Sequence, residues 1–416
     1  MSVETQEPQD QGPSSTEAGR RYVDPTPYDP ASQVDGGDRP DLDAPTGKLI
    51  RKRFLRHRLA VVSLLFLGFL YAMLPFIEVI APYTSNERQS KYLYAPPQTV
   101  HLFHEGDFIG PFVYPLKPNH DLQTFQRRYV EDTSSPQRLR FFCSGSDYKF
   151  WGMFEADFHL VCPPRLENGR DGVFFLLGTD RLGRDMFSRL LYGARISLTV
   201  GLIGIAISFL IGITLGGLAG YFGGWVDSVV QRMIEVIRSL PELPMWLALS
   251  AAVPPNWSPI GVFFMISIIL GLLDWPGLAR AVRSKLLALR EEDYVRAAEL
   301  IGASPARVIR THLIPNFMSH IVVSASLAIP TMILGETALS FLGLGLRPPV
   351  TSWGVMLEEA RNLTVVEFYP WLILPMLPVI LVVLAFNFLG DGLRDAMDPY
   401  SQLQRLYRLI SSLTVR

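Results

Sequence analysis

The chain has 416 residues, of which 49% are hydrophobic and 19% charged, and its formal net charge is −1. This composition excludes an ordinary soluble globular protein, which carries more charge, and a globally basic protein that binds nucleic acid. We therefore expect a membrane protein with several spans and with enough length for a further domain.

The amino-terminal region changes character near residue 48. Residues 1–48 are rich in Pro, Asp, Glu, Gln, Ser and Gly, which predicts a disordered tail, and we expect no removable signal peptide. A basic run from Arg51 to Arg58 then precedes an apolar stretch, Leu59 to Ala81, that is long enough to cross a bilayer. Residues 49–81 are predicted to form the first transmembrane helix, with the tail in the cytoplasm.

Residues 82–189 contain no stretch apolar enough to span a membrane, so we expect one large periplasmic insertion. It is predicted to be rich in β-structure. Two strand-like runs, one around a turn at 105–107 and one around a turn at 144–147, indicate two hairpins.

The insertion contains both cysteines, Cys143 and Cys162. In an oxidising compartment they are candidates for a disulfide, but two free, partly buried thiols are an equally good interpretation, since spacing does not give their geometry. The histidines of the insertion match no compact metal-ligand spacing, so we expect surface histidines and no metal or other cofactor. They are His101, His104, His120 and His159.

Residues 190–400 are predicted to supply five further spans, which together with the first make an all-α membrane bundle of six transmembrane helices. In the second span, small residues recur at every fourth position, a pattern that lets helices pack closely in lipid. They are Gly204, Ser208, Gly212, Gly216 and Gly220. The fourth and sixth spans are expected at about 259–273 and 371–390, and residues 401–416 form a second cytoplasmic tail.

Charged residues near membrane depth are candidates for a gate or a transport path. In the third span, about Val229 to Val253, they recur at three-residue steps and are followed by prolines expected to bend the helix. A solvated helix end stabilised by i,i+3 pairs is an equally good interpretation. A further acid lies near the outer end of the fifth span, about 318–342. The four candidates are Arg232, Glu235, Arg238 and Glu336.

The loop at 284–317 is polar, basic and rich in helix formers, and it is predicted to dock a cytoplasmic partner. A first helix, 285–301, is expected to end at Gly302, where positive φ is easily adopted. Ser304 and Pro305 begin a second helix, which the restriction before Pro315 is expected to close. The candidate docking residues are Tyr294, Arg296, Ala297, Ala298, Gly302, Ala303, Ser304 and Pro315.

This loop resembles the "EAA" loop of bacterial ABC-importer permeases, with matches at Ala297, Ala298, Gly302 and Pro315. It departs from the pattern at Arg296, where the family has glutamate, and at His312 and Ile314. The segment from Phe175 to Leu202, which precedes and enters the second span, closely resembles the dipeptide, oligopeptide and nickel permeases, as do the last two spans. The resemblance implies a C-type subunit with the type I ABC importer permease fold.

The resemblance also implies partners: a second permease, two ATPase subunits, and a periplasmic solute-binding protein. The chain itself has no phosphate-binding loop of the Walker type and no hydrolase motif, so we expect no enzyme activity. Peptides are the expected cargo, moved from periplasm to cytoplasm across the inner membrane by alternating access, with both termini in the cytoplasm. Two alternatives stay open: a secondary transporter, and a membrane-anchored receptor that acts through the insertion.

Overall fold

The computed structural model describes residues 46–120, 127–150, 153–165, 171–254 and 256–397. The tails predicted at 1–48 and 401–416 lie outside the described residues, apart from 46–48. The chain divides into two units, Met1–Lys48 and Leu49–Arg416, and the second unit holds the features described below.

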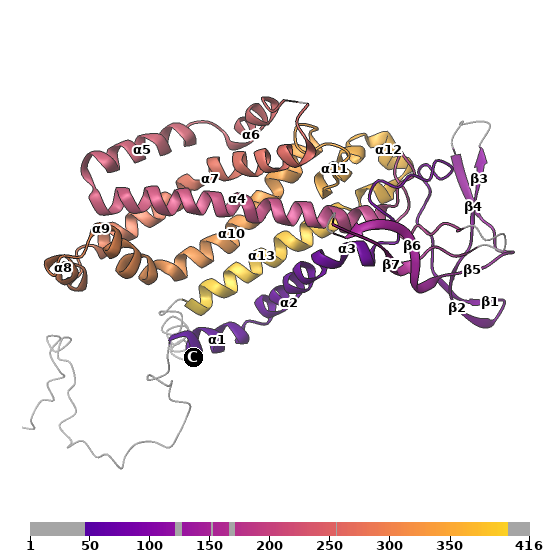
Figure 1. Ribbon diagram of the computed structural model, residues 1–416, viewed down its shortest axis with the longest axis horizontal. Coiled ribbons are helices and arrows are strands. Elements are labelled where there is room, and N and C mark those ends of the chain that lie inside the picture. Colours follow the sequence, from indigo (N-terminus) through magenta and orange to yellow (C-terminus); the bar gives the residue numbers. More distant parts are fainter. Residues whose placement is uncertain (1–45, 121–126, 151–152, 166–170, 255, 398–416) are drawn as a thin grey trace, which may run out of the picture. The chain divides into compact units, whose positions relative to one another are not determined.

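Helices make up most of the second unit (Figure 1). Five described segments are long and apolar enough to cross a membrane, namely Arg58–Ile80, Met186–Phe222, Pro259–Leu289, Pro305–Phe341 and Pro370–Met397. The α-helices are α1 Thr46–Arg56, α2 Arg58–Met73, α3 Ile77–Ile80, α4 Met186–Phe222, α5 Gly224–Arg238, α6 Glu242–Ala251, α7 Pro259–Leu289, α8 Asp293–Leu300, α9 Pro305–Arg307, α10 Ile314–Phe341, α11 Trp353–Glu358, α12 Leu363–Phe368 and α13 Met376–Met397.

The boundaries of the long helices follow local chemistry. Asp185 caps α4 by accepting a hydrogen bond from the Ser188 amide, and Gly223 ends that helix with a φ of +65°. Ser258 caps α7, and Pro259 follows at its first position, where the missing N–H costs nothing.

Three predicted spans differ from the structure. The first, expected at 49–81, is divided at His57, which caps α2, so the membrane-length segment begins at Arg58. The third, expected at 229–253, is two helices, because Pro241 lacks an amide hydrogen and is extended, so the chain breaks between α5 and α6. The fourth does not end near Leu273 but continues as α7 to Leu289, through Pro276. Proline inside a membrane helix is tolerated where neighbouring groups satisfy the freed backbone.

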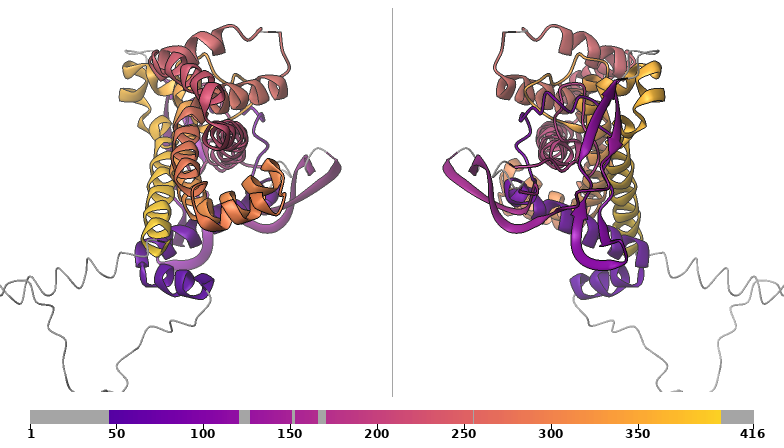
Figure 2. Two further views of the ribbon diagram at one scale, coloured as in Figure 1. Left: turned by 90° about the vertical axis from the view of Figure 1, so that its left-hand side faces the viewer. Right: turned by 90° about the vertical axis from the view of Figure 1, so that its right-hand side faces the viewer.

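Helix α4 lies at the centre of the bundle and packs most extensively against α7 and then α10 (Figure 2). The stripe of small residues makes this possible. A Cβ added at Gly216 would lie 2.5 Å from the Ala279 carbonyl oxygen, and one added at Gly220 would lie 2.9 Å from the Arg283 oxygen. All five residues of the stripe are buried.

Seven strands lie between residues 101 and 162: β1 His101–His104, β2 Asp107–Val113, β3 Leu116–His120, β4 Arg127–Glu131, β5 Gln137–Arg138, β6 Arg140–Phe150 and β7 Phe154–Cys162. Strands β1, β2 and β5 form one sheet, and β3–β4 and β6–β7 form two antiparallel pairs. The first predicted hairpin is confirmed, because β1 and β2 pair around Glu105 and Gly106.

The second hairpin differs from its prediction. Residues 144–147 form no turn but continue β6, where a register shift between Ser144 and Tyr148 accommodates them. In the structure Cys143 and Cys162 are joined in a disulfide between β6 and β7. His159 is not a surface residue: it is buried, and its ring nitrogens contact the carbonyl oxygens of Ala81 and Ser146 at 2.7 and 2.9 Å.

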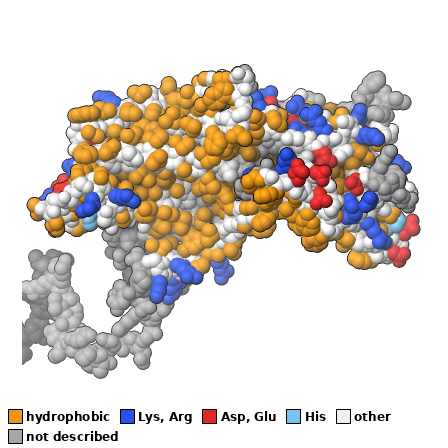
Figure 3. All heavy atoms as spheres, viewed as in Figure 1, with side chains coloured by type: hydrophobic (Ala, Val, Ile, Leu, Met, Phe, Trp, Pro, Cys, Tyr) orange, Lys and Arg blue, Asp and Glu red, His pale blue; other side chains and the backbone are white. Residues whose placement is uncertain are grey.

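The surface of the helices is strongly apolar on the face seen in Figure 3, with charged side chains gathered toward the two ends. Large apolar residues on α2 and α13 are exposed, such as Leu65, Phe69 and Leu377. Exposed apolar surface of this extent fits contact with lipid or with other membrane helices.

Candidate docking site and buried polar clusters

The predicted docking loop is a jointed element at one end of the bundle, made of α8, α9 and a π-helical turn at Val308–Leu313 (Figure 1). Gly302 forms the joint with a φ of +88°, as predicted. The amide of Ala303 bonds back to the Ala298 carbonyl at 3.0 Å, which completes the end of α8. Ser304 precedes Pro305, the first residue of α9, but makes no side-chain cap.

Two details of the predicted helix pair are wrong. The first helix is not continuous from 285 to 301, because α7 ends at Leu289 and α8 begins only at Asp293. The second does not close before Pro315: the chain continues through the π-turn, and Pro315 lies in the first turn of α10. A proline in the first turn needs no intrahelical donor, so the docking element runs directly into a membrane-length helix.

A buried apolar cluster fixes this element to the bundle. Val295 of α8 is fully buried against a group that includes Leu286 of α7, Val308 and Leu313. Two hydrogen bonds also hold the element against the bundle. Tyr221, at the end of α4, donates to Glu299 at 2.7 Å, and Asn316 donates to the Tyr294 hydroxyl at 3.0 Å. The element is therefore held against α4, α7 and α10 by both packing and hydrogen bonds.

The outward side of the element is exposed. Arg296 and Ala297 are exposed, and Arg296 pairs with Glu291 at 2.7 Å. Hydrogen bonds from Arg296 and Arg290 lower the pKa of Glu291 below its usual value. The position where the resembling family has an acid thus holds a base that is already paired within the loop.

Two functional candidates were missed from the sequence. Leu300 and Ile301, directly before Gly302, are 89% and 87% exposed, the highest values among the large apolar side chains of the described residues. In the sequence, Leu300 and Ile301 lie at the end of a predicted helix, where apolar residues usually belong to the buried face. Exposed apolar side chains beside a rigid joint are typical of the centre of a protein interface.

At the opposite end of the bundle, a buried ion-pair cluster joins segments that are far apart in the sequence. Asp180 is fully buried and accepts from Arg184 at 2.6 Å and also from Arg189, which is 1% exposed. Glu359, between α11 and α12, lies 3.5 Å from Arg184 and 3.7 Å from Arg189. Burial, reinforced by the charge of Asp180, raises the pKa of Glu359. We call these four residues the outer cluster.

Glu336 does not lie at a solvated interface, because it is completely buried. It accepts hydrogen bonds from three serines: Ser352 at 2.7 Å, Ser340 at 2.8 Å and Ser197 at 3.1 Å. These serines come from the start of α11, from α10 and from α4. The carboxylate therefore ties three segments together.

The other three gate candidates lie elsewhere. Arg232, Glu235 and Arg238 are exposed on α5, and Arg232 pairs with Glu235 at 2.8 Å. An i,i+3 pair of this kind is expected in both interpretations, so the role of these three residues stays a prediction. The structure does not bring them to Glu336, whose hydrogen-bond partners are the three serines.

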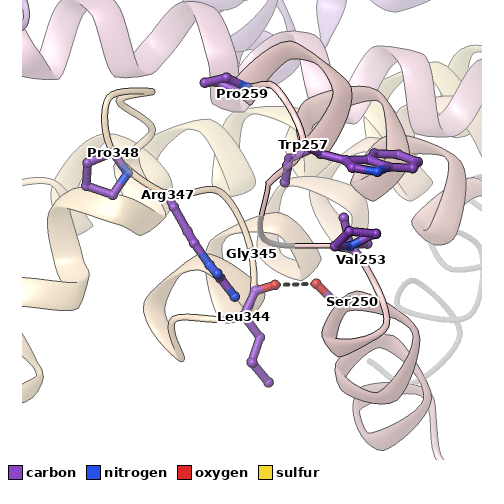
Figure 4. Close-up of a pocket in the computed structure, with 10 residues that line it drawn as sticks. Ser250, Val253, Trp257, Pro259, Leu344, Gly345, Arg347 and Pro348 are labelled. Carbon is purple, nitrogen blue, oxygen red and sulfur yellow. Dashed lines mark hydrogen bonds between the residues drawn. The ribbon is translucent and has the colours of Figure 1, made fainter.

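A small pocket opens between α6, the start of α7 and the loop after α10 (Figure 4). It has a volume of about 130 Å³, and its lining includes Trp257, Pro259, Leu344 and one cationic side chain, Arg347. The Ser250 hydroxyl donates to the Leu344 carbonyl across one side of it.

A bundle of five membrane-length segments with an exposed, jointed element at one end defines a helical multi-pass membrane protein. Comparison with known proteins agrees with this class. The family described as "Binding-protein-dependent transport system inner membrane component" matches residues 212–400. The family described as "N-terminal TM domain of oligopeptide transport permease C" matches residues 46–97.

Two permeases are similar to this chain in sequence. The "Dipeptide transport system permease protein DppC" of Bacillus subtilis (strain 168) is 44% identical over 223 residues, which are 53% of this chain and 68% of that protein. The "Glutathione transport system permease protein GsiD" of Pectobacterium atrosepticum is 41% identical over 235 residues, 56% of this chain and 75% of that protein. A solved inward-facing MetNI methionine ABC transporter chain is matched at 18% identity and a TM-score of 0.39, over 51% of this chain and 98% of that chain.

The chain belongs to the inner-membrane permease subunits of binding-protein-dependent ABC importers, in the C-type branch of the peptide permeases. It is a multi-pass membrane protein and not an enzyme, because in this family a separate ATPase subunit hydrolyses ATP and a binding protein delivers the solute.

Proposed function

We propose that this permease pairs with a second, related permease and imports peptides by alternating access, driven through the docking element. One observation supports this most directly. The surface formed by Leu300, Ile301 and Ala297 is exposed, while the opposite side of α8 is anchored by the fully buried Val295. An element that is fixed on one side and open on the other can pass force from an attached protein into the bundle.

The proposed movement follows the continuous helices. Force on α8 reaches α7 and α10 through the cluster around Val295 and reaches α4 through the bond between Tyr221 and Glu299. The close backbone approach at Gly216 makes α4 and α7 move as one body. Glu336 then links α4 and α10 to α11 at the far end, so that inner and outer openings alternate.

The proposed topology places the docking element, both termini and the basic α1 in the cytoplasm, and residues 82–189 in the periplasm. Arg51, Lys52 and Arg56 beside the first span support this orientation. Helices α5 and α6 are each too short to span a membrane and together supply the sixth crossing. In the periplasm Cys143 and Cys162 stay oxidised, so thiol titration without reductant should find no free thiol.

Peptides are the proposed cargo because the matched relatives are named as dipeptide, di/tripeptide and glutathione permeases. Glutathione and ordinary dipeptides both carry a free carboxylate. Arg347 in the small outer pocket is a cation that such a carboxylate would meet on entry.

The test replaces Gly302 with valine in the complete importer. Gly302 has positive φ and open space around its Cβ position, so valine strains the joint without a clash, at about 1–3 kcal/mol. We expect normal membrane insertion with loss of ATP-coupled peptide uptake in proteoliposomes. Gly224→Val is the matched control, since Gly224 also has positive φ and no neighbour within 4 Å. Normal uptake by Gly302→Val, or equal loss in the control, would contradict the proposal.

Orientation has its own test. A membrane-impermeant thiol reagent added to intact cells should leave Arg290→Cys unlabelled and should label Leu363→Cys, which is on the exposed α12 at the other end. External labelling of Arg290→Cys would overturn the topology and the transport scheme with it.

A further inference from the structure

A second pocket lies at the end of the bundle that carries the docking element. Helices α7, α10 and α13 enclose it, and its volume is about 790 Å³. It is separate from the exposed docking surface of α8, because its lining begins at Lys285 and continues on the α10 and α13 sides. The proposed transport scheme makes no use of it.

The three helices each bring one basic side chain to this pocket: Lys285 from α7, His320 from α10 and Arg394 from α13. All three side chains line the same pocket. None of the described residues that line the pocket is acidic. Two cations, Lys285 and Arg394, and a histidine that can donate a hydrogen bond, with no carboxylate among the lining residues, make a site for an anion.

Most of the polar lining residues of α10 lie near its start, beside Phe317, and the deeper lining residues are Val323, Ser324 and Leu327. Asn316, Ser319 and His320 lie near the start of the helix, and Val323 and Leu327 follow one and two turns further into the bundle. At a rise of 1.5 Å per residue, Leu327 lies roughly 10 Å deeper than His320. A ligand that fits has an anionic head and an apolar tail.

The position of the pocket matches the inner membrane surface. Ala60 of α2 packs closely on Gly392 of α13, and Phe54 of α1 joins Ala60 and Ala396 in one buried cluster. Arg394 lies between Gly392 and Ala396 in the sequence, and it lines the pocket. The neighbouring α1 exposes Arg51 and Lys52 in the same inner region, as expected for a helix beside anionic headgroups.

We propose that this pocket binds the phosphate headgroup of an anionic phospholipid from the inner leaflet, with an acyl chain along Val323 and Leu327. Basic pockets between helices on the cytoplasmic side are suited to such headgroups. Bound lipid would brace α7 and α10 where both helices meet the docking element. The proposal requires the cytoplasmic orientation given above, but not the identity of the cargo.

The test uses the complete importer purified from native membranes. Native mass spectrometry should detect retained phosphatidylglycerol, and titration in phosphatidylcholine nanodiscs should measure its affinity. The variant Lys285→Gln with Arg394→Gln should bind more weakly by about 30-fold, at roughly fivefold for each cation near an anionic surface. Arg51→Gln with Lys52→Gln is the matched control, because it removes the same charge from the exposed face of α1 and should bind as wild type.

Three results would overturn the proposal: equal affinity in the pocket variant, an equal loss in the α1 control, or displacement of the lipid by inorganic phosphate at millimolar concentration. The last would identify a small-anion site. If the double variant fails to assemble, a photoactivatable phosphatidylglycerol on the wild-type importer should crosslink to 316–327 of α10, and crosslinks confined to α2 would contradict the site. If the lipid test fails while Arg290→Cys stays unlabelled in intact cells, the lipid proposal alone is wrong. If Arg290→Cys is labelled from outside, the orientation is wrong as well.

Discussion

The two ends of the bundle are built in opposite ways. At the docking end, the ion pair between Arg296 and Glu291 is local in the sequence and exposed, and the apolar surface at Leu300 and Ile301 is left open. At the far end, the outer cluster joins Asp180 to residues around Glu359 and removes its charges from solvent. One end leaves an apolar surface exposed, and the other end pairs and buries its charged groups within the chain.

The difference indicates that the two ends of the bundle are suited to different roles. An open surface costs little stability, because exposed side chains such as Leu300 contribute few contacts to the folded chain. A buried ion-pair cluster holds distant segments in one geometry, and removing one member leaves an uncompensated charge. The docking end is therefore suited to transient force, and the outer end to a fixed attachment of α4 to the segment after α11.

The largest expected effect on stability is at the outer cluster. Arg189→Ala leaves the buried Asp180 without one of its two arginines and should lower the free energy of unfolding by about 3–5 kcal/mol. Chemical unfolding in detergent measures this. Arg181→Ala, which removes a half-exposed arginine that reaches the same Glu359, should cost less than about 1 kcal/mol. Equal effects of the two variants would show that burial of the cluster is unimportant.

The contrast between local and distant contacts also explains which features could be predicted from the sequence. The docking joint was predictable because Gly302, Ser304 and Pro305 act on their own neighbours through backbone conformation. The stripe from Gly204 to Gly220 was visible because helical spacing is local. The outer cluster was not predictable, since Glu359 lies 175 residues or more from Asp180 and Arg184, and no spacing rule connects them.

Failures at the element boundaries have the same origin. The break at 290–292 and the π-turn before Pro315 depend on how Val295 and Leu313 fit the buried cluster, which is tertiary packing. Burial of Glu336 depends on Ser197 and Ser352, from two other segments. Its place in the predicted span put this acid near the outer end of a helix but did not indicate which residues surround it.

The second largest effect concerns Asp185, which caps α4 beside the outer cluster. Burial raises its pKa from 3.8 to about 6. The raised pKa means that the folded protein favours the protonated acid, so its contribution to stability is present below pH 4 and is lost as the pH rises from about 4 to 6. Two pKa units correspond to about 3 kcal/mol.

Asp185→Asn keeps the cap oxygen and should flatten this pH dependence, with a gain of up to about 3 kcal/mol at pH 7. Unfolding measured from pH 4 to 8 tests the sign. Asp132→Asn is the control, because hydrogen bonds from Lys117 and Ser134 lower the pKa of the half-buried Asp132 to about 2, outside this window. An unchanged slope in Asp185→Asn would contradict the assignment.

A smaller effect is expected in α4, the helix that runs between the two ends. Gly216→Ala places a methyl group against the backbone of Ala279 and should cost about 1–3 kcal/mol. Gly217→Ala is the matched control on the next residue, where the nearest atom is a side-chain carbon at 3.9 Å, and it should be neutral or slightly stabilising. If both variants behave alike, close packing of α4 on α7 does not join the two ends.

The smallest effect on stability should coincide with a large loss of function. Leu300→Glu changes a side chain that is 89% exposed, so the free energy of unfolding should move by less than about 0.5 kcal/mol. Burying a leucine at an interface contributes about 1.5–3 kcal/mol, and its loss should weaken capture of the ATPase subunits by roughly 10- to 100-fold.

Leu363→Glu provides the control at the opposite end, where the side chain is 83% exposed. It should match Leu300→Glu in stability and leave ATPase capture intact. A stability loss in Leu300→Glu would mean that this leucine serves the fold, and unchanged capture would mean that the ATPase docks elsewhere. The expected result, stable protein with weak capture at one end only, assigns partner binding to the end that the chain leaves open.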